Sequence, residues 1–348
     1  PKSRKVSTPS KARLTIRIPY VDINGTRLIQ TWIFAMICCL FLLLLKVTRS
    51  CSVFIVRNPV VASILSLPAK LTNVIVVYRI LSVPYLWEEI ELESKFLSPL
   101  FRFLDASVLR HANLVIGASD HASNRLSWRS NVYKIPFSVA PRFYAIPETQ
   151  HYEPPLEHSQ ISFLSVGYVG SFNKLYDFRE FLMAVESLAD PCSLSVRLVG
   201  DGPRKRQLLE LLSMLNLQAL VEVRSSIDPE TVPAFLQTLD VLINPQVERH
   251  RGLSIKVLEA MASGLVVVTT VGHPEYGRPG VSYMLIKNEV EEFRHVIAKL
   301  LSDSNLLRKT SKRAREHASS FTRQIAAQHW RNALLPLAQK TTANSLKR

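Results

Sequence analysis

Short apolar runs alternate with helical patterns along most of this chain, and this alternation constrains its fold more than any other feature. Three of the runs, NVIVVYRI (73–80), VLINP (241–245) and LVVVTT (265–270), are rich in β-branched residues. Such runs are typical of strands buried on both faces. Strands that alternate with helices favour parallel sheets covered by helices on both sides. The sequence therefore predicts a doubly wound α/β fold.

The alternation occurs in two series, separated by residues 140–160, which contain four prolines and show no period. A proline-rich stretch of this kind indicates a linker, and 348 residues suffice for two domains. Ligands of doubly wound domains bind at the carboxyl ends of the strands, here in a cleft between the domains. We predict Rossmann-like domains at 1–140 and 161–320, a linker at 141–160, and a closing helix with a basic tail at 321–348.

The predicted elements follow from the same patterns. We expect strands within 52–59, 73–80, 113–119, 131–137, 161–170, 193–203, 221–226, 241–245 and 265–270. We expect helices within 60–71, 86–112 (broken near Pro99), 177–189, 204–217 and 229–240, and from Ser254 to Gly264.

The net charge is +15 and is unevenly distributed. Residues 1–150 hold 19 Lys and Arg against 8 Asp and Glu, whereas residues 151–348 hold 24 against 20. The asymmetry indicates an acidic partner for the first half, such as an anionic membrane face, nucleic acid or a phosphorylated substrate, or it serves solubility. The chain shows no recognisable nucleic-acid motif and no basic-aromatic stripe, so we expect no nucleic-acid partner.

Cysteine usage and one apolar run bear on location. The four cysteines show no metal-ligand spacing, which fits reduced thiols in a cytoplasmic protein. The run WIFAMICCLFLLLL (32–45) has 14 uncharged residues, fewer than the roughly 20 needed to span a bilayer. It predicts either a buried helix or a helix lying in a membrane interface. The expected location is cytoplasmic, with peripheral contact to an anionic membrane as one alternative.

The segment GLSIKVLEAMASGLVVVTT (252–270) predicts a helix that leads into a strand. Ser254 is a preferred N-cap residue, and Gly264 suits the left-handed position that ends a helix. Because this helix follows a parallel strand, its N-terminus lies at the carboxyl edge of the sheet, where free N–H groups and the helix dipole favour an anion. Gly252 would let the backbone approach a ligand closely.

Lys256 and Glu259 lie three residues apart on one side of this helix. The opposite, buried face is expected to hold Ile255, Val257, Leu258, Met261 and Ala262. The two charged residues could form a surface ion pair worth a few tenths of a kcal/mol. Alternatively, Lys256 meets a phosphate oxygen and Glu259 accepts hydrogen bonds from two adjacent hydroxyls. A nucleoside diphosphate sugar carries both groups.

The run RGLSIKVLEAMASGLVVVTT (251–270) resembles the donor-binding signature of family-four glycosyltransferases (GT4), which have the two-domain GT-B fold. The resemblance continues through SVGYVGSF (165–172), VRLVGDGP (196–203) and VPAFLQTLDVLINP (232–245), in the order of the family. It covers nearly all of 160–330 and is weaker in 50–140. It implies a hexosyltransferase-like, metal-independent enzyme that transfers a sugar with retention from a nucleotide-sugar donor to an unknown glycan or lipid-linked acceptor. No cofactor is implied, and no Asp-x-Asp metal motif is present.

The resemblance also implies site residues. Glu259 would hold the donor's ribose, Lys256 and Lys174 would meet phosphate, and Gly170 with Ser171 would form the turn beside the diphosphate. Ser226 would lie in the loop that faces the nucleobase, or in an ordinary strand-end turn. The full donor-binding set is Gly170, Ser171, Lys174, Ser226, Arg249, Arg251, Gly252, Leu253, Ser254, Lys256 and Glu259. No catalytic residue or metal ligand is assigned.

The sequence departs from the family at two positions. Arg251 stands where the family often has a Glu, and no His follows VVYRI, where Leu81 stands instead. These departures support an alternative, a non-catalytic binding or partner subunit with the same fold. The opening strand and glycine-rich loop of the family are also not visible, so we expect the acceptor-side N-terminal domain to lack its native start.

Overall fold

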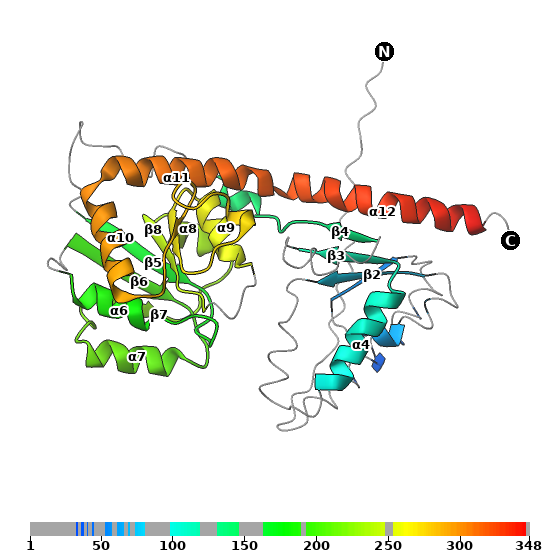
Figure 1. The fold of residues 1–348 in the computed structure, drawn as a ribbon, viewed down its shortest axis with the longest axis horizontal. Coiled ribbons are helices and arrows are strands. Elements are labelled where there is room, and N and C mark those ends of the chain that lie inside the picture. Colours follow the sequence, from blue (N-terminus) through cyan, green and yellow to red (C-terminus); the bar gives the residue numbers. More distant parts are fainter. Residues whose placement is uncertain are drawn as a thin grey trace, which may run out of the picture. The chain divides into compact units, whose positions relative to one another are not determined.

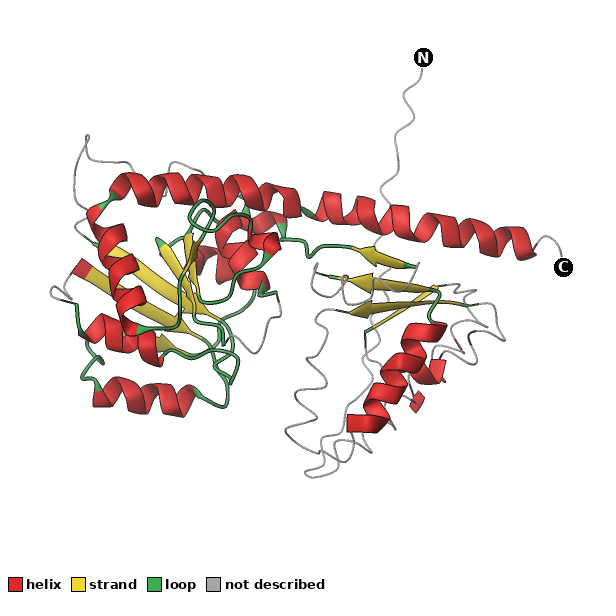
Figure 2. Cartoon of the chain, viewed as in Figure 1, coloured by secondary structure: helices red, strands yellow, loops and turns green. Residues whose placement is uncertain are grey.

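The computed structural model describes residues 33, 36, 37, 40, 44, 53–57, 61–65, 69, 74–80, 98–118, 131–145, 163–188, 193–247 and 253–345. The chain divides into two compact units, one formed by Pro1–Tyr78 and Pro99–Asn113 and the other by Arg79–Ser98 and Leu114–Arg348. Two sheets of parallel strands with flanking helices confirm the predicted α/β fold class (Figures 1 and 2). The predicted domain boundaries themselves stay a prediction.

The first sheet has four strands in the order β1-β2-β3-β4. β1 runs parallel to β2, and β3 runs parallel to β4. Each strand lies inside a range that the sequence predicts as a strand. They are β1 (Val53–Val56), β2 (Ile75–Ile80), β3 (Leu114–Gly117) and β4 (Val132–Lys134).

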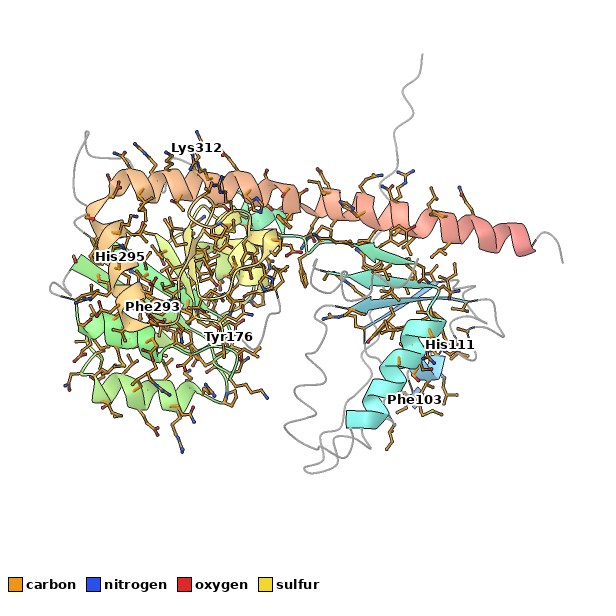
Figure 3. All side chains as sticks on the ribbon, viewed as in Figure 1. Phe103, His111, Tyr176, Phe293, His295 and Lys312 are labelled. Carbon is orange, nitrogen blue, oxygen red and sulfur yellow. The ribbon has the colours of Figure 1, made fainter. Side chains whose placement is uncertain are left out.

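Helix α4 (Ser98–His111) leads toward β3 in the chain. Pro99 lies in its first turn, where a missing N–H costs no hydrogen bond, so this proline begins the described helix. The rest of the predicted 86–112 helix, and Leu81, lie outside the described residues. Asn113 secures the helix end, because its side-chain oxygen accepts from the Val76 N–H at 2.8 Å. His111 is exposed, with Nδ1 2.8 Å from the Ser107 carbonyl of the same helix (Figure 3).

The second sheet has six strands in the order β10-β9-β8-β5-β6-β7, and every described pairing is parallel. From β5 the chain moves outward through β6 to β7, and from β8 it moves outward the other way through β9 to β10 (Figure 1). The order therefore reverses between β5 and β8, which is the topological switch point where ligands of such sheets bind. The strands are β5 (Leu164–Val169), β6 (Leu194–Val199), β7 (Val221–Arg224), β8 (Val241–Asn244), β9 (Val266–Thr269) and β10 (Met284–Leu285).

Helices cover both faces of this sheet, each with its own apolar core. One core includes α6 (Arg179–Glu186), α7 (Lys205–Met214) and α10 (Val290–Ser302), where the rings of Phe181 and Phe293 meet at 5.6 Å (Figure 3). The other includes α8 (Val232–Leu236), α9 (Ile255–Ala262) and α11 (Ser304–Ala318). Helices α10 and α11 are not among the elements that the sequence patterns predicted.

The start of the predicted linker packs on the second core. Phe143, in the short helix η1 (Pro141–Phe143), is buried there together with Val139. The Tyr144 hydroxyl donates to the Ala318 carbonyl at 2.7 Å, and Arg315 donates to the Tyr144 carbonyl at 2.9 Å. Residues 146–162 lie outside the described residues. The closing helix predicted from residue 321 is α12 (Arg323–Ser345), with Pro336 inside it.

Five residues of the apolar run 32–45 are described, and all five are helical. Their side chains are between 44% and 65% exposed, so the alternative of a buried helix is wrong for these positions. They are Ile33, Met36, Ile37, Leu40 and Leu44. No helix within the described part of the chain is long and apolar enough to cross a membrane.

Candidate functional site

The candidate site lies at the switch point, beyond the carboxyl ends of β5 and β8. Gly170 follows β5 with a φ of +149°, a backbone conformation that favours glycine. A Cβ on Gly200, after β6, would lie 1.8 Å from the Gly170 carbonyl oxygen. The two turns therefore touch backbone to backbone, which only glycine permits. Ser171, next in the chain, is exposed, and its carbonyl oxygen accepts from the Tyr168 hydroxyl at 2.9 Å.

Helix α9 begins at the same edge. Ser254 is its buried N-cap residue, as predicted, but its hydroxyl makes no capping bond to the first-turn amides. The Ser254 N–H donates to the Tyr276 hydroxyl at 2.7 Å. The backbone conformation of Ser254 therefore defines the start of α9, and the Ser254 hydroxyl does not accept hydrogen bonds from the N–H groups of the first turn. Leu253 is partly buried against the neighbouring core.

Lys256 is partly buried at the first turn of α9. Its Nζ donates to the Tyr168 hydroxyl at 2.6 Å, and lies 4.1 Å from the Tyr168 ring centroid and 3.8 Å from that of Tyr176. Among the described side chains, none carrying a carboxylate forms an ion pair with it. Burial lowers the pKa of Lys256 from 10.5 to about 7, an effect that the nearby Glu259 carboxylate partly opposes.

Glu259 is also partly buried, one helical turn further along. Burial raises the pKa of Glu259 to about 7, while the positive charges of Arg142 and Lys256 act in the opposite direction. The surface ion pair considered for Lys256 and Glu259 is absent from the described contacts, and neither side chain is fully exposed. Of the residues expected on the buried face, Val257, Leu258, Met261 and Ala262 are buried, but Ile255 is 37% exposed.

The loop that follows β7 is held by a carboxylate. Asp201 accepts from the Ser226 N–H and from the Lys205 ammonium, both at 2.6 Å. These hydrogen bonds, first that from Lys205, lower the pKa of Asp201 to about 2. Ser226 itself is exposed. Its turn is therefore tied to the glycine turn after β6, which carries Asp201.

The remaining predicted site residues lie in a loop or outside the described part of the chain. Lys174 is partly buried in the loop after β5. Arg249, Arg251 and Gly252 lie outside the described residues. His273 is buried, with its ring 5.2 Å from that of Tyr276. No group of three His, Cys, Asp or Glu side chains that could hold a metal occurs among the residues with described positions.

Sequence reasoning missed the tyrosines of the site. Tyr168 lies in β5 and is fully buried, and Tyr176 follows in the loop, where it forms a bridge with Gln246 after β8 (Figure 3). Both face Lys256, and Tyr276 faces Ser254. A buried strand whose central position holds a tyrosine is a usable signal, because a buried phenol requires a hydrogen-bond partner.

The assembled geometry offers a distinct set of chemical groups. It brings a desolvated ammonium, a carboxyl group and a glycine turn together at one edge of one sheet. The ammonium suits an anion, and the carboxyl group suits hydroxyl donors. The Gly170 N–H donates to the Val199 carbonyl at 2.9 Å, so the glycine turn contributes close approach of the backbone to a ligand. A ligand that carries phosphate at one end and vicinal hydroxyls at the other would match all three.

Part of the chain matches a family of known proteins. Residues 164–303 match the family model described as "Glycosyl transferases group 1". A putative colanic acid biosynthesis glycosyltransferase, WcaL of Salmonella typhimurium, is 31% identical over 137 residues, which cover 37% of this chain and 34% of that protein. The chain spans between 17% and 36% of the length of the curated relatives it matches.

Solved structures resemble the chain over most of its length. Sucrose-phosphate synthase from Thermosynechococcus elongatus superposes with a TM-score of 0.72 at 17% identity, covering 88% of this chain and 79% of that one. Anabaena HepE in complex with UDP-glucose superposes with a TM-score of 0.66 at 15% identity, covering 83% and 79%. At such identities the likeness shows the fold, and the predicted two-domain architecture is confirmed.

Proposed function

We propose that this chain, whose residues 164–303 form a group 1 glycosyltransferase domain of the GT4 type within a GT-B fold, transfers a sugar with retention from a nucleoside diphosphate sugar to a glycan or lipid-linked acceptor. One observation carries the proposal. The Lys256 ammonium is desolvated at the switch point, beside the Gly170 turn, without a carboxylate counterion among the described residues. An anionic ligand would supply the missing charge.

Lys256 is the proposed diphosphate ligand. A lysine that burial has made easier to deprotonate regains its proton when phosphate oxygens approach, so binding and protonation reinforce each other. The positive end of the α9 dipole adds to the attraction, and the turn at Gly170 and Ser171 would lie beside the diphosphate. Lys174 is a second proposed phosphate partner, together with Arg249, Arg251 and Gly252 from the segment outside the described residues.

Glu259 is the proposed ribose ligand. Its carboxyl group is desolvated, so hydrogen bonds from two vicinal hydroxyls would replace lost water and stabilise the charged form. Leu253 and Ser254 lead into the helix that carries it, and the Ser226 turn is proposed to face the nucleobase. The asymmetric charges, cation toward phosphate and carboxylate toward sugar hydroxyls, fix the direction in which the nucleotide binds.

The proposed chemistry needs these groups to stabilise the leaving diphosphate. The bond between the sugar's anomeric carbon and the β-phosphate oxygen breaks, and that oxygen keeps the electron pair. The acceptor oxygen forms the new bond on the same face, and its proton passes to the leaving phosphate. Charges already in position at the diphosphate lower the barrier without reorganisation. Lys256 and the α9 N-terminus would provide them without a metal.

Relatives support the choice of first ligands to test. HepE was crystallised with UDP and with UDP-glucose, which supports a uridine donor here. The name of WcaL, a putative colanic acid biosynthesis glycosyltransferase, supports a glycan acceptor. A thermal-shift screen against nucleoside diphosphates and their sugars would identify the donor, because a ligand that binds only the folded state raises its stability.

Peripheral contact with an anionic membrane is part of the proposal. The exposed apolar residues Ile33, Met36, Ile37, Leu40 and Leu44 repeat at intervals of three and four, which places them on one helical face. The first 150 residues carry the excess positive charge that anionic lipid attracts. Flotation with acidic vesicles at low salt should carry the protein upward. Failure to float under these conditions would exclude this contact.

Calorimetry tests the donor site directly. Lys256→Ala and Glu259→Ala should each weaken UDP binding at least tenfold, whereas Lys299→Ala, on the exposed side of α10, should leave it unchanged. Unchanged affinity in both site variants would refute the roles given to these residues.

A non-catalytic subunit of the same fold is the second candidate, favoured by Arg251 and Leu81, which depart from the family pattern. Both residues lie outside the described part of the chain. Transfer from, or hydrolysis of, a panel of nucleotide sugars separates the two candidates. Donor binding without turnover on any acceptor would favour the binding subunit.

A further inference from the structure

Two tyrosines enclose the Lys256 ammonium. Its Nζ lies 3.8 Å from the Tyr176 ring centroid and 4.1 Å from that of Tyr168, and donates to the Tyr168 hydroxyl at 2.6 Å. The two rings meet edge to face, with centroids 5.5 Å apart. We call Tyr168 and Tyr176 the tyrosine cage. The cage stabilises a cation through ring faces and one hydroxyl, none of which carries a full negative charge.

The Tyr168 hydroxyl joins the two elements of the site. It accepts from Lys256 on α9 and donates to the Ser171 carbonyl after β5, at 2.9 Å. The ring is fully buried and packs against Phe172 and Phe178, with centroid distances of 5.8 and 4.8 Å. Because close packing fixes this ring, the strand sets the position of the hydroxyl, and the hydroxyl sets the position of the ammonium.

The absence of a side chain on Gly170 makes space for the Lys256 ammonium. A Cβ on Gly170 would lie 2.6 Å from the Lys256 Nζ and 3.0 Å from the Tyr168 hydroxyl oxygen. The lysine therefore reaches the glycine turn itself, not merely its vicinity. Any anion bound against this turn would meet the ammonium.

We propose that Tyr168 is a positioning residue of the donor site, with Tyr176 as the second ring of the cage. This inference rests on the proposed function. The cage holds Lys256 beside the Gly170 turn and leaves its charge unneutralised, so the ligand's diphosphate is the first anion that it pairs with. A carboxylate in place of the cage would form a buried ion pair, which phosphate would have to break before it could pair with the lysine.

Other charged and titratable groups surround the cage. Glu259 lies on the same helix as Lys256, and Arg142 from η1 acts on Glu259. The Ser254 side chain and Tyr276 from η4 (Pro274–Tyr276) both act on the Tyr176 hydroxyl electrostatically. Burial raises the pKa of all three tyrosines, Tyr168, Tyr176 and Tyr276, so they stay neutral around pH 7. Only Lys256 and Glu259 of this group titrate near pH 7.

Tyr168→Phe is the direct test, because it removes the hydroxyl and keeps the ring. We expect about a tenfold loss of UDP affinity, the usual effect of losing one hydrogen bond to a charged group. The hydroxyl stabilises the charged lysine, so without it the pH midpoint at which UDP binding weakens should move to lower pH. Calorimetric titrations with UDP between pH 6 and 9 measure both quantities.

Two further variants separate positioning from simple packing. Tyr144→Phe is the matched control, since it removes a partly buried hydroxyl that donates to the Ala318 carbonyl and lies away from Lys256. It should lower stability slightly and leave both affinity and midpoint unchanged. Tyr176→Phe should bind UDP nearly as wild type, whereas Tyr176→Leu should lose several-fold because it lacks the ring.

The inference is overturned if Tyr168→Phe loses stability as Tyr144→Phe does, yet keeps wild-type affinity and midpoint. Its failure is distinguishable from that of the proposed function. NMR titration of the lysine side chains in the ligand-free protein follows Lys256 without any nucleotide. A Lys256 signal that titrates near pH 7 and moves lower in Tyr168→Phe supports the cage, even if wild type binds no UDP. In that case the proposed function fails alone.

Discussion

Replacing Lys256 by methionine should stabilise the protein while weakening its nucleotide affinity. The pKa of Lys256 is lowered from 10.5 to about 7, so the unfolded chain binds this proton more tightly than the folded one. Because stability rises with pH wherever the unfolded state holds more protons, the ammonium destabilises the fold fully below pH 7, and the effect fades between pH 7 and 10.5. The cost is on the order of 4 kcal/mol at pH 7 and about 2 kcal/mol at pH 9.

Methionine keeps an apolar side chain of similar length between the rings of Tyr168 and Tyr176. The lost hydrogen bond to the Tyr168 hydroxyl and the lost cation–π contacts oppose the gain by about 1–2 kcal/mol. A net stabilisation of about 2 kcal/mol at pH 7 should remain. UDP affinity should fall between tenfold and a hundredfold, the usual cost of losing a charge-assisted contact.

Urea unfolding at pH 7 and pH 9 measures the stability, and calorimetry measures the affinity. Lys299→Met is the control, because that lysine is exposed on α10 and should change neither quantity. A Lys256→Met protein that is less stable than wild type at pH 7 would refute the reasoning. So would a stability difference that does not shrink between pH 7 and pH 9.

Three other changes have defined outcomes. Gly170→Ala should weaken UDP binding at least tenfold and lower the melting temperature, because its Cβ would lie 2.6 Å from the Lys256 Nζ; a wild-type melting curve would count against the described turn. Glu259→Gln should raise the free energy of unfolding at pH 8, because burial in the folded state raises the pKa of Glu259 to about 7 and so disfavours its charged form at this pH. The same variant should bind UDP and 2′-deoxy-UDP with more similar affinities than wild type does. An unchanged ratio of the two affinities would contradict the role of Glu259 as ribose ligand. Asp201→Asn should speed hydrogen exchange at the Ser226 amide, which donates to Asp201 at 2.6 Å; the pKa of about 2 means that this support is present above the usual pKa of 3.8 and is lost as pH falls toward 2.

The positions of strands were predicted from the sequence better than those of helices. Runs such as 241–245 and 265–270 carry β-branched residues because both faces of a parallel strand are buried. A strand of this kind can therefore be predicted from a few consecutive residues. Helix α8 is shorter than predicted, at Val232–Leu236 within 229–240. The amphipathic sequence pattern continues beyond Leu236, where the helix ends, because the position of a helix end depends on tertiary contacts.

Part of the candidate site could be predicted from the sequence. Lys256 was identified because a cation in the first turn of a helix at the carboxyl edge of the sheet can meet an anion, with a surface ion pair as the alternative, and Gly170 was identified through the resemblance to the family. The tyrosine cage could not be predicted, because Tyr168 and Tyr176 have the sequence surroundings of ordinary apolar residues in a strand and a loop. Their role depends on Lys256, which is 88 residues away from Tyr168 in the chain and meets it only through the sheet order.

Proton uptake on nucleotide binding tests the central claim most directly. At pH 8, calorimetric titration of UDP in two buffers with different ionisation enthalpies counts the protons that binding takes from solution. Because Lys256 is mostly neutral at this pH and must be charged to pair with phosphate, binding should take up nearly one proton per UDP, and Lys256→Met should abolish this uptake. Binding with no proton uptake, or with the same uptake in Lys256→Met, would contradict the account.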